Sequence, residues 1–227
     1  MRLLQTKNQV ATFIALLFHV SGFIAIGIFK SQLFIDLTPL NLLVSFGLIL
    51  YTQPKPNSAF FAFLAIAFAI GFGAEWIGIN TGRLFGNYQY GTVLGPEWQG
   101  VPWLIGVNWF IMMYTIGISF HMFHKMLEGK AGELSSFNKK YMAFSLVFDG
   151  AALAVLVDWV IEPVAIKMGL WSWSGNVIPS LNYWSWFGVS VIIMIIFRLL
   201  PFEKHNLFAV HLLLIQLMFF LLLSKVF

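Results

Sequence analysis

The stretch AFFAFLAIAFAIGFGAEWIGI, residues 59–79, decides the class of fold. It is apolar apart from Glu75, and it is long enough for a helix that crosses the bilayer core, which takes about 20 residues. A carboxyl group inside such a helix is costly to insert and is a functional-site hypothesis by default. We therefore expect a membrane helix with a candidate site near its C-terminal end.

The composition of the whole chain agrees with this interpretation. Of the 227 residues, 59% are hydrophobic and 10% are charged, whereas soluble domains average about 45–50% and about 25%. The absence of cysteine excludes disulfides, thiolate metal sites and cysteine nucleophiles. The net charge of +4 is better explained by lysines in membrane loops than by nucleic-acid binding. We predict an all-α, polytopic membrane helix bundle that forms a single integral membrane domain, residues 1–227.

Seven stretches are long and apolar enough to span a bilayer. They are residues 9–29, 33–51, 59–79, 102–123, 141–161, 184–200 and 206–225. The second is the weakest, because Asp36, Pro39 and Asn41 interrupt it. The first is longer than the apolar core of a signal peptide and lacks a small-residue cleavage pattern, so we interpret it as a span.

The loops between these stretches predict the orientation of the chain. With the N-terminus inside, lysines and arginines are more numerous on the cytoplasmic side, as the positive-inside rule requires. We therefore predict a cell-membrane protein with a cytoplasmic N-terminus and an outside C-terminus. The long connections 80–101 and 162–183 then both lie outside, whereas 124–140 is a short, polar, lysine-bearing loop on the inside.

Tryptophan is distributed unevenly along the chain. All nine tryptophans lie between Trp76 and Trp186, in the predicted outer loops or the outer halves of adjoining helices. An aromatic belt is one explanation, but belts form at both interfaces. The one-sided distribution favours an aromatic cavity near the outer face.

Three carboxyl groups are predicted to lie close to these tryptophans. Asp158 and Glu162 are four residues apart and share a helix face. Glu75 belongs to a stripe of small residues that would let another helix approach closely. If the helices over 59–79 and 141–161 are neighbours, the three groups meet at one depth. Asp149 lies about 13 Å deeper than Asp158, on the opposite face.

Such a cluster could act as an acid. Burial and the negative charge of neighbouring carboxylates both favour the protonated form of a carboxyl group, so that one of the three is still protonated near neutral pH, as a general acid must be. In the structural alternative, Glu75 pairs with Arg83, and Glu162 lies at the water interface with Lys167.

Other classes of membrane protein fit less well. Five histidines with a single H-x-x-H pair are too few for a di-iron oxygenase, and we expect no metal site. The last predicted helix has no lysine at its middle for a retinal Schiff base. The Asp-rich motifs of membrane prenyltransferases are also missing.

Two blocks of residues resemble a known family, the carotenoid 1,2-hydratases of the CruF type. The first block comprises Gly71, Glu75, Gly78, Thr81, Gly82, Phe85, Gly86, Tyr88, Tyr90, Leu94, Gly95, Pro96, Val101 and Pro102. The second comprises Asp158, Glu162, Pro163, Gly169, Leu170, Trp171, Trp173, Pro179, Asn182 and Trp186. The resemblance runs from the third span to the start of the sixth. Glu162 stands where relatives often carry a second aspartate, a change that retains acid chemistry.

The resemblance implies addition of water to the terminal 1,2 double bond of an acyclic carotenoid end. This chemistry needs no cofactor. From the residues themselves we expect catalysis by Glu75, Asp158 and Glu162, with Asp158 or Glu75 as the general acid and the partner carboxylate, including Glu162, as the base. Six residues are expected to contact the substrate, its cation or water: Thr81, Tyr88, Tyr90, Trp171, Trp173 and Asn182. The expected partners are a lipophilic carotenoid, water, the lipid bilayer and other enzymes of the carotenoid pathway, and not nucleic acid.

Two alternatives stay open at this point. Cyclisation or isomerisation of the carotenoid end would begin with the same protonation, and cyclisation adds no mass. A proton-coupled transporter or a carotenoid-binding protein would also carry intramembrane carboxyl groups, with Asp149 as a second proton station. Repeated halves and interrupted helix pairs, which are common in transporters, are not evident.

Overall fold

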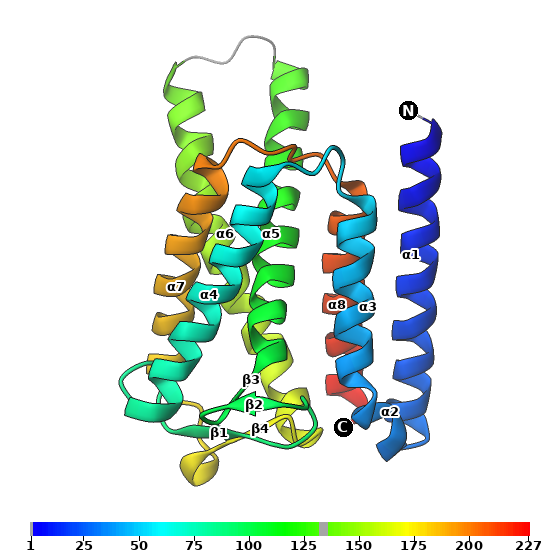
Figure 1. The fold of residues 1–227 in the computed structure, drawn as a ribbon, viewed down its shortest axis with the longest axis vertical. Coiled ribbons are helices and arrows are strands. Elements are labelled where there is room, and N and C mark those ends of the chain that lie inside the picture. The colour runs from blue at the N-terminus through cyan, green and yellow to red at the C-terminus, as the bar shows by residue number, and fades with distance from the viewer. Residues whose placement is uncertain (1, 132–135) are drawn as a thin grey trace.

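The computed structural model describes residues 2–131 and 136–227, which form a bundle of long helices (Figure 1). The helices are α1 (Arg2–Gly22), α2 (Gln32–Asp36), α3 (Thr38–Thr52), α4 (Ser58–Thr81), α5 (Trp103–Ala131), α6 (Ser136–Lys167), α7 (Ser180–Leu199) and α8 (Leu207–Val226). A π-helical segment, η1 (Phe23–Ile28), continues α1, and η2 (Ser174–Asn176) is a single 3₁₀ turn. Four short strands complete the fold: β1 (Tyr88–Tyr90), β2 (Glu97–Trp98), β3 (Val101–Pro102) and β4 (Trp171–Trp173).

The prediction of an all-α membrane bundle is confirmed. Within the described residues, six helical segments are long and apolar enough to cross a membrane. The expected second span is shorter than the others, because α3 has 15 residues, so a count of seven spans stays a prediction. The two termini lie at opposite ends of the bundle (Figure 1). Which end faces the cytoplasm stays a prediction too.

The expected single helix over 33–51 is in fact two helices. The chain bends at Leu37, between α2 and α3, and Pro39 lies in the first turn of α3. Proline is tolerated there because the first N–H groups of a helix have no intrahelical partner. The side chain of Asp36 accepts a 2.9 Å hydrogen bond from Gln32 Nε2 within α2. The interrupting residues therefore mark a helix boundary.

The prediction of a loop over 124–140 is largely wrong. Helix α5 continues to Ala131 and α6 begins at Ser136, while residues 132–135 lie outside the described part of the chain. The segment contains Lys, Glu, Met and Leu, which are all good helix formers. Its polarity indicates helix ends beyond the apolar spans and not a lack of helix.

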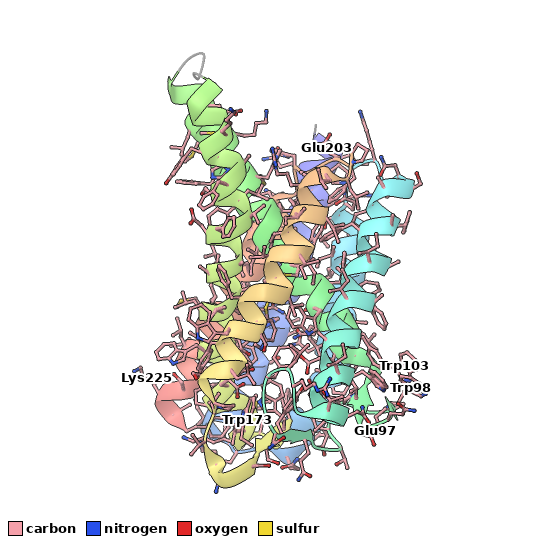
Figure 2. The ribbon with its side chains drawn as sticks, turned by 90° about the vertical axis from the view of Figure 1, so that its left-hand side faces the viewer. Glu97, Trp98, Trp103, Trp173, Glu203 and Lys225 are labelled. Atoms are coloured by element: carbon pink, nitrogen blue, oxygen red, sulfur yellow. The ribbon has the colours of Figure 1, made fainter. Side chains whose placement is uncertain are left out.

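The four strands lie together at one end of the bundle, and they pair in two antiparallel ribbons, β1 with β4 and β2 with β3. The long connections after α4 and after α6 are therefore ordered, and the first pairing joins them. Figure 2 shows Trp98, Trp103 and Trp173 at this end of the molecule and Glu203 at the other. The concentration of tryptophan in the sequence corresponds to this end.

The small residues of α4 receive an aromatic side chain of the neighbouring helix. A Cβ atom built on Gly71 would lie 2.4 Å from Cβ of Trp109 on α5. No rotation of the indole relieves a clash with its own Cβ. Gly71 therefore fixes how closely α4 and α5 pack and where the ring of Trp109 lies.

We predict that Gly71→Ala destabilises the protein by about 1–3 kcal/mol, the usual effect of overfilling a packed core. Gly73→Ala is the matched control, because a Cβ on Gly73 would meet nothing within 4 Å. Thermal unfolding of both variants in the same detergent measures the difference. Equal melting temperatures would contradict this view of the α4–α5 contact.

Candidate active site

Three carboxyl side chains line a single small cavity near the strand end of the bundle. They are Glu75 from α4 and Asp158 and Glu162 from α6, with exposed fractions of 4%, 3% and 2%. The cavity has a volume of about 40 Å³. A water molecule needs roughly 10–15 Å³ of such space, so the cavity has room for a few waters and not for a large end group.

The helices that carry these groups do not pack mainly against each other. Helix α4 packs against α5 and α7, and α6 packs against α5, α7 and α8. The cavity lies between α4, α5, α6 and α7. Glu75 therefore faces Asp158 and Glu162 across the cavity and not through a direct helix contact. The three groups share a site because they project into the same space.

Asn182 of α7 holds the two carboxyl groups of α6 together. Its Nδ2 donates to Oδ2 of Asp158 at 2.9 Å and to Oε1 of Glu162 at 3.5 Å. Asp158 and Glu162 point the same way because residues four apart share a helix face. The amide is buried, and its contacts connect α6 to α7 at the cavity.

The ribbon of β1 and β4 covers the cavity. Tyr88 pairs with Trp173, and Tyr90 pairs with Trp171. Alternate residues of a strand project to the same face, so these four aromatic side chains point into the bundle. The residues between them, Gln89 and Ser172, are exposed.

Each strand of the cover serves one side of the cavity. The hydroxyls of Tyr88 and Tyr90 both donate to Oε2 of Glu75, the second at 2.8 Å. The indole nitrogens of Trp171 and Trp173 donate to Oε2 of Glu162 at 2.9 and 3.0 Å. The pairing of two distant loops thus sets the positions of four hydrogen-bond donors over two carboxyl groups.

The backbone keeps the two loops in close contact beyond the strands. The amide of Gly91 donates to the carbonyl oxygen of Leu170 at 2.8 Å. A Cβ on Gly91 would lie 2.1 Å from the carbonyl oxygen of Gly169. Only glycine permits this approach, so Gly91 is required where the loops meet.

The tyrosines of the cover stay protonated. Burial raises the pKa of both hydroxyls, and the negative charge of Glu75 raises the pKa further. Both groups therefore remain hydrogen-bond donors throughout the physiological range of pH.

Two tryptophans that the sequence reasoning did not select complete the wall. Trp109 of α5 donates from Nε1 to Oε1 of Glu75 at 3.1 Å. Its ring stacks on Trp186 of α7, with centroids 4.0 Å apart. An indole inside a predicted span, where its N–H needs a partner, is the sequence signal that would have identified Trp109.

Eight of the nine tryptophans divide into two groups, and Trp76 is half-buried. Trp109, Trp171, Trp173 and Trp186 line the carboxyl cavity. Trp98, Trp103, Trp159 and Trp184 are exposed on the outside of the bundle, as in an interfacial belt. The cavity and belt interpretations each describe part of the set.

Thr81 is the one predicted site residue that the structure does not bring to the cavity. It is exposed, and its hydroxyl donates to the carbonyl oxygen of Ile77 at 2.6 Å. Six residues after Glu75, it has turned to another side of α4, since each residue of a helix rotates by about 100°. Thr81 stabilises the end of its own helix.

The ion pairs considered as alternatives for the carboxyl groups do not form among the described residues. Arg83 and Lys167 are exposed, whereas Glu75 and Glu162 are buried with tyrosine and tryptophan donors. Asp149 is separate from the cluster and accepts a 2.5 Å hydrogen bond from Ser145. Within the described chain, no group of three or more His, Asp or Glu side chains has the geometry to hold a metal ion.

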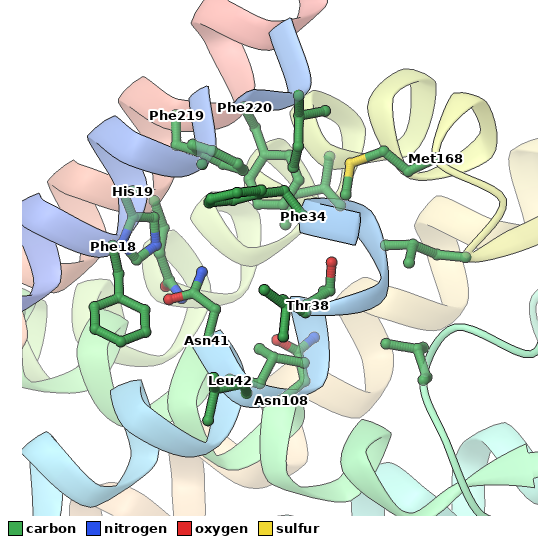
Figure 3. A pocket seen from close by; sticks show the side chains of 18 of the residues that line it. Phe18, His19, Phe34, Thr38, Asn41, Leu42, Asn108, Met168, Phe219 and Phe220 are labelled. Atoms are coloured by element: carbon green, nitrogen blue, oxygen red, sulfur yellow. The ribbon is translucent and has the colours of Figure 1, made fainter. Parts of the chain in front are cut away.

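A second, larger cavity adjoins the first and was not predicted from the sequence. Its volume is about 310 Å³, and its walls come from α1, η1, α2, α3, α5, α6, α8 and the loops beside the strands. Ile105, Asn108 and Trp171 line both cavities. Figure 3 shows the phenylalanines Phe34, Phe219 and Phe220 on one side of the larger cavity, with Thr38 and Asn108 on another.

Comparison with known sequences agrees with this description. The sequence model of a family described as carotenoid biosynthesis protein matches residues 39–227. The chain belongs to this family. It is thus a multi-pass membrane protein with a role in carotenoid biosynthesis. No curated protein and no solved structure matches the chain. The family match includes every residue of the carboxyl cavity and its cover.

We predict that Tyr90→Phe lowers the free energy of unfolding by about 1–3 kcal/mol, because the buried Oε2 of Glu75 loses a hydrogen-bond donor. Gln89→Ala, one residue away on the exposed face of the same strand, should change it by less than about 0.5 kcal/mol. Unfolding in detergent measures both variants. If Gln89→Ala is as harmful as Tyr90→Phe, the role assigned to the inner face of the cover is wrong.

Proposed function

We propose that the protein is a carotenoid 1,2-hydratase, which adds water to the terminal 1,2 double bond of an acyclic carotenoid end. One observation carries the proposal: three buried carboxyl groups share a water-sized cavity that adjoins a larger apolar one. Membership of a carotenoid biosynthesis family supplies the substrate class. The apolar cavity suits a polyene, and the carboxyl cavity suits acid–base chemistry.

The proposed reaction moves two protons and changes no net oxidation level. A carboxylic acid transfers its proton to the less substituted alkene carbon, so that an O–H bond breaks and the π electrons form a C–H bond. The other alkene carbon becomes a tertiary cation. The oxygen of a water molecule then forms a C–O bond to this carbon, and a carboxylate takes the released proton. Water in the cavity would return the proton to the acid.

The hydrogen bonds indicate which carboxyl group acts as the acid and which acts as the base. Asp158 accepts one hydrogen bond, from Asn182, whereas Glu75 accepts three, from Tyr88, Tyr90 and Trp109. Donors stabilise the ionised form of a carboxyl group. We assign the acid role to Asp158 and the base role to Glu75. Glu162, with two indole donors, would help to orient the water.

The aromatic rings have a second role in this scheme. A cation is stabilised over the face of an aromatic ring, most strongly over tryptophan. Trp171, Trp173 and the stacked pair of Trp109 and Trp186 line the cavity in which the tertiary cation would form. The β1–β4 cover would also separate this cation from bulk water, so that only a water already in the cavity reacts.

The size of the cavity favours hydration over cyclisation. Cyclisation requires the polyene to fold back on itself so that a ring closes beside the acid. A space of about 40 Å³ is suited to a chain tip with a water molecule. Hydration therefore fits the cavity better.

We expect Asp158→Asn to abolish hydrated product in a host that makes lycopene, because an amide has no acidic proton to transfer. Asp149→Asn is the matched control: it changes the same residue type on the same helix, outside the cavity. Mass spectrometry of extracted carotenoids measures a gain of one water mass per reacted end. Glu75→Gln should also lose the product.

Each outcome has a clear meaning. Normal hydration by Asp158→Asn would remove Asp158 from the mechanism. A wild-type product that has reacted without gaining the mass of water would overturn the hydratase proposal in favour of cyclisation. Loss of product in Asp149→Asn as well would indicate a general effect of changing carboxyl groups on α6.

A further inference from the structure

The larger cavity is more than an extension of the carboxyl site. We propose that it binds the polyene chain next to the reacting end, and that Ile105, Asn108 and Trp171 form the passage through which the end reaches the carboxyl groups. This inference rests on the proposed function for the identity of the ligand. Apart from Ile105, Asn108 and Trp171, the residues that line it do not line the carboxyl cavity. We refer to this space as the polyene chamber.

The walls of the chamber have the chemistry of a lipophilic site. Most are apolar side chains, among them Phe34 near the turn between α2 and α3, Met168 after α6, and Phe219 and Phe220 of α8 (Figure 3). Its volume of about 310 Å³ is near the lower end of the range for ligand pockets, roughly 300–1,000 Å³. It would therefore hold one part of a long carotenoid, with the remainder in the lipid.

The chamber adjoins the carboxyl cavity, and three residues line both spaces. Ile105 and Asn108 are three residues apart on α5 and share a face, and both line both cavities, as does Trp171 of the cover. Trp171 also donates to Glu162. In the proposal, a chain tip that passes these three residues arrives at the carboxyl groups. The shared lining is the main reason for assigning a polyene, and not an unrelated lipid, to the chamber.

The chamber also borders the outside of the bundle. Leu17 of α1, Leu37 before α3 and Leu40 of α3 line it, and all three are exposed on the surface of the protein. At these residues the wall of the chamber is also the outer surface of the bundle. In the proposal, the substrate enters here from the bilayer, between α1 and α3, without passing through water.

One wall of the chamber has a polar character. Among the described residues, Asn41 Oδ1 is buried and has no hydrogen-bond partner. Asn41 lies on α3 and Asn108 on α5, two helices that pack together, and both residues line the chamber. The space beside Asn41 would accept a water molecule next to the chain. We therefore expect the polyene to lie against the phenylalanine side chains of the chamber and not beside Asn41.

The part of the chamber wall that α1, η1 and α2 contribute lies outside the matched family region. Residues 17–38 contribute Leu17, Phe18, His19, Phe34 and Leu37 to it, whereas the family match begins at residue 39. The carboxyl cavity, in contrast, is built entirely from the matched region.

Two pairs of neighbouring leucines test the chamber. Leu42 and Leu213 line it, whereas Leu43 and Leu214 are 49% and 55% exposed on the lipid side. Each is replaced by tryptophan in the full-length protein, purified in nanodiscs with lycopene. Lycopene is achiral, so a circular dichroism signal in its absorption band reports only the pigment bound at a chiral protein site. Far-ultraviolet circular dichroism checks that each variant retains its helices.

We expect Leu42→Trp and Leu213→Trp to weaken binding by about tenfold or more, because the added ring occupies the space of the chain. Leu43→Trp and Leu214→Trp should bind like wild type. No induced signal in wild type, or equal signals in all four folded variants, would overturn the proposal that the chamber binds the polyene. If the signal behaves as expected but no water is added to lycopene, the chamber stands and the hydratase proposal fails.

Discussion

The arrangement of this protein depends on one constraint: three carboxyl groups lie within an apolar bundle and need hydrogen-bond partners there. A buried carboxyl group without partners is strongly destabilising. The helices supply only part of the solution, with Trp109 for Glu75 and Asn182 for Asp158. The remaining donors come from two loops that lie far apart in the sequence and pair as β1 and β4. The pairing of these loops therefore also influences the protonation of the carboxyl groups, because it positions their hydrogen-bond donors.

The same constraint explains how a membrane protein can confine water and a polyene in adjoining spaces. The β1–β4 ribbon covers the carboxyl cavity with indoles and phenols whose polar atoms point at Glu75 and Glu162. Beyond Ile105 and Asn108 the walls become apolar, and leucines border the lipid. In the proposed reaction, the alkene and the water would reach the acid from environments of opposite polarity. The passage between the cavities is where the two would meet.

The sequence predicts the class of fold and the composition of the site better than it predicts their connections. Hydropathy identifies the spans, and the rule that intramembrane carboxyl groups have functions selects Glu75, Asp158 and Glu162. Helical spacing cannot show that α4 and α6 face each other across a cavity formed with α5 and α7, because that depends on packing between distant segments. The register of β1 with β4 is non-local for the same reason. Thr81 was selected by its place in a motif, yet it lies on another side of its helix. The larger cavity has no sequence signal, because its walls come from segments that lie far apart in the chain and meet only through packing.

The central claim is that a carboxyl group protonates the alkene and that water from the adjoining cavity captures the cation. The most direct test is turnover of lycopene by the purified protein in water labelled with the heavy oxygen isotope. Mass spectrometry of the product then reports the source of its oxygen. The account predicts one heavy oxygen atom in every new hydroxyl group, in the presence or absence of air. A product whose oxygen comes from air, or one that gains no oxygen, would contradict it.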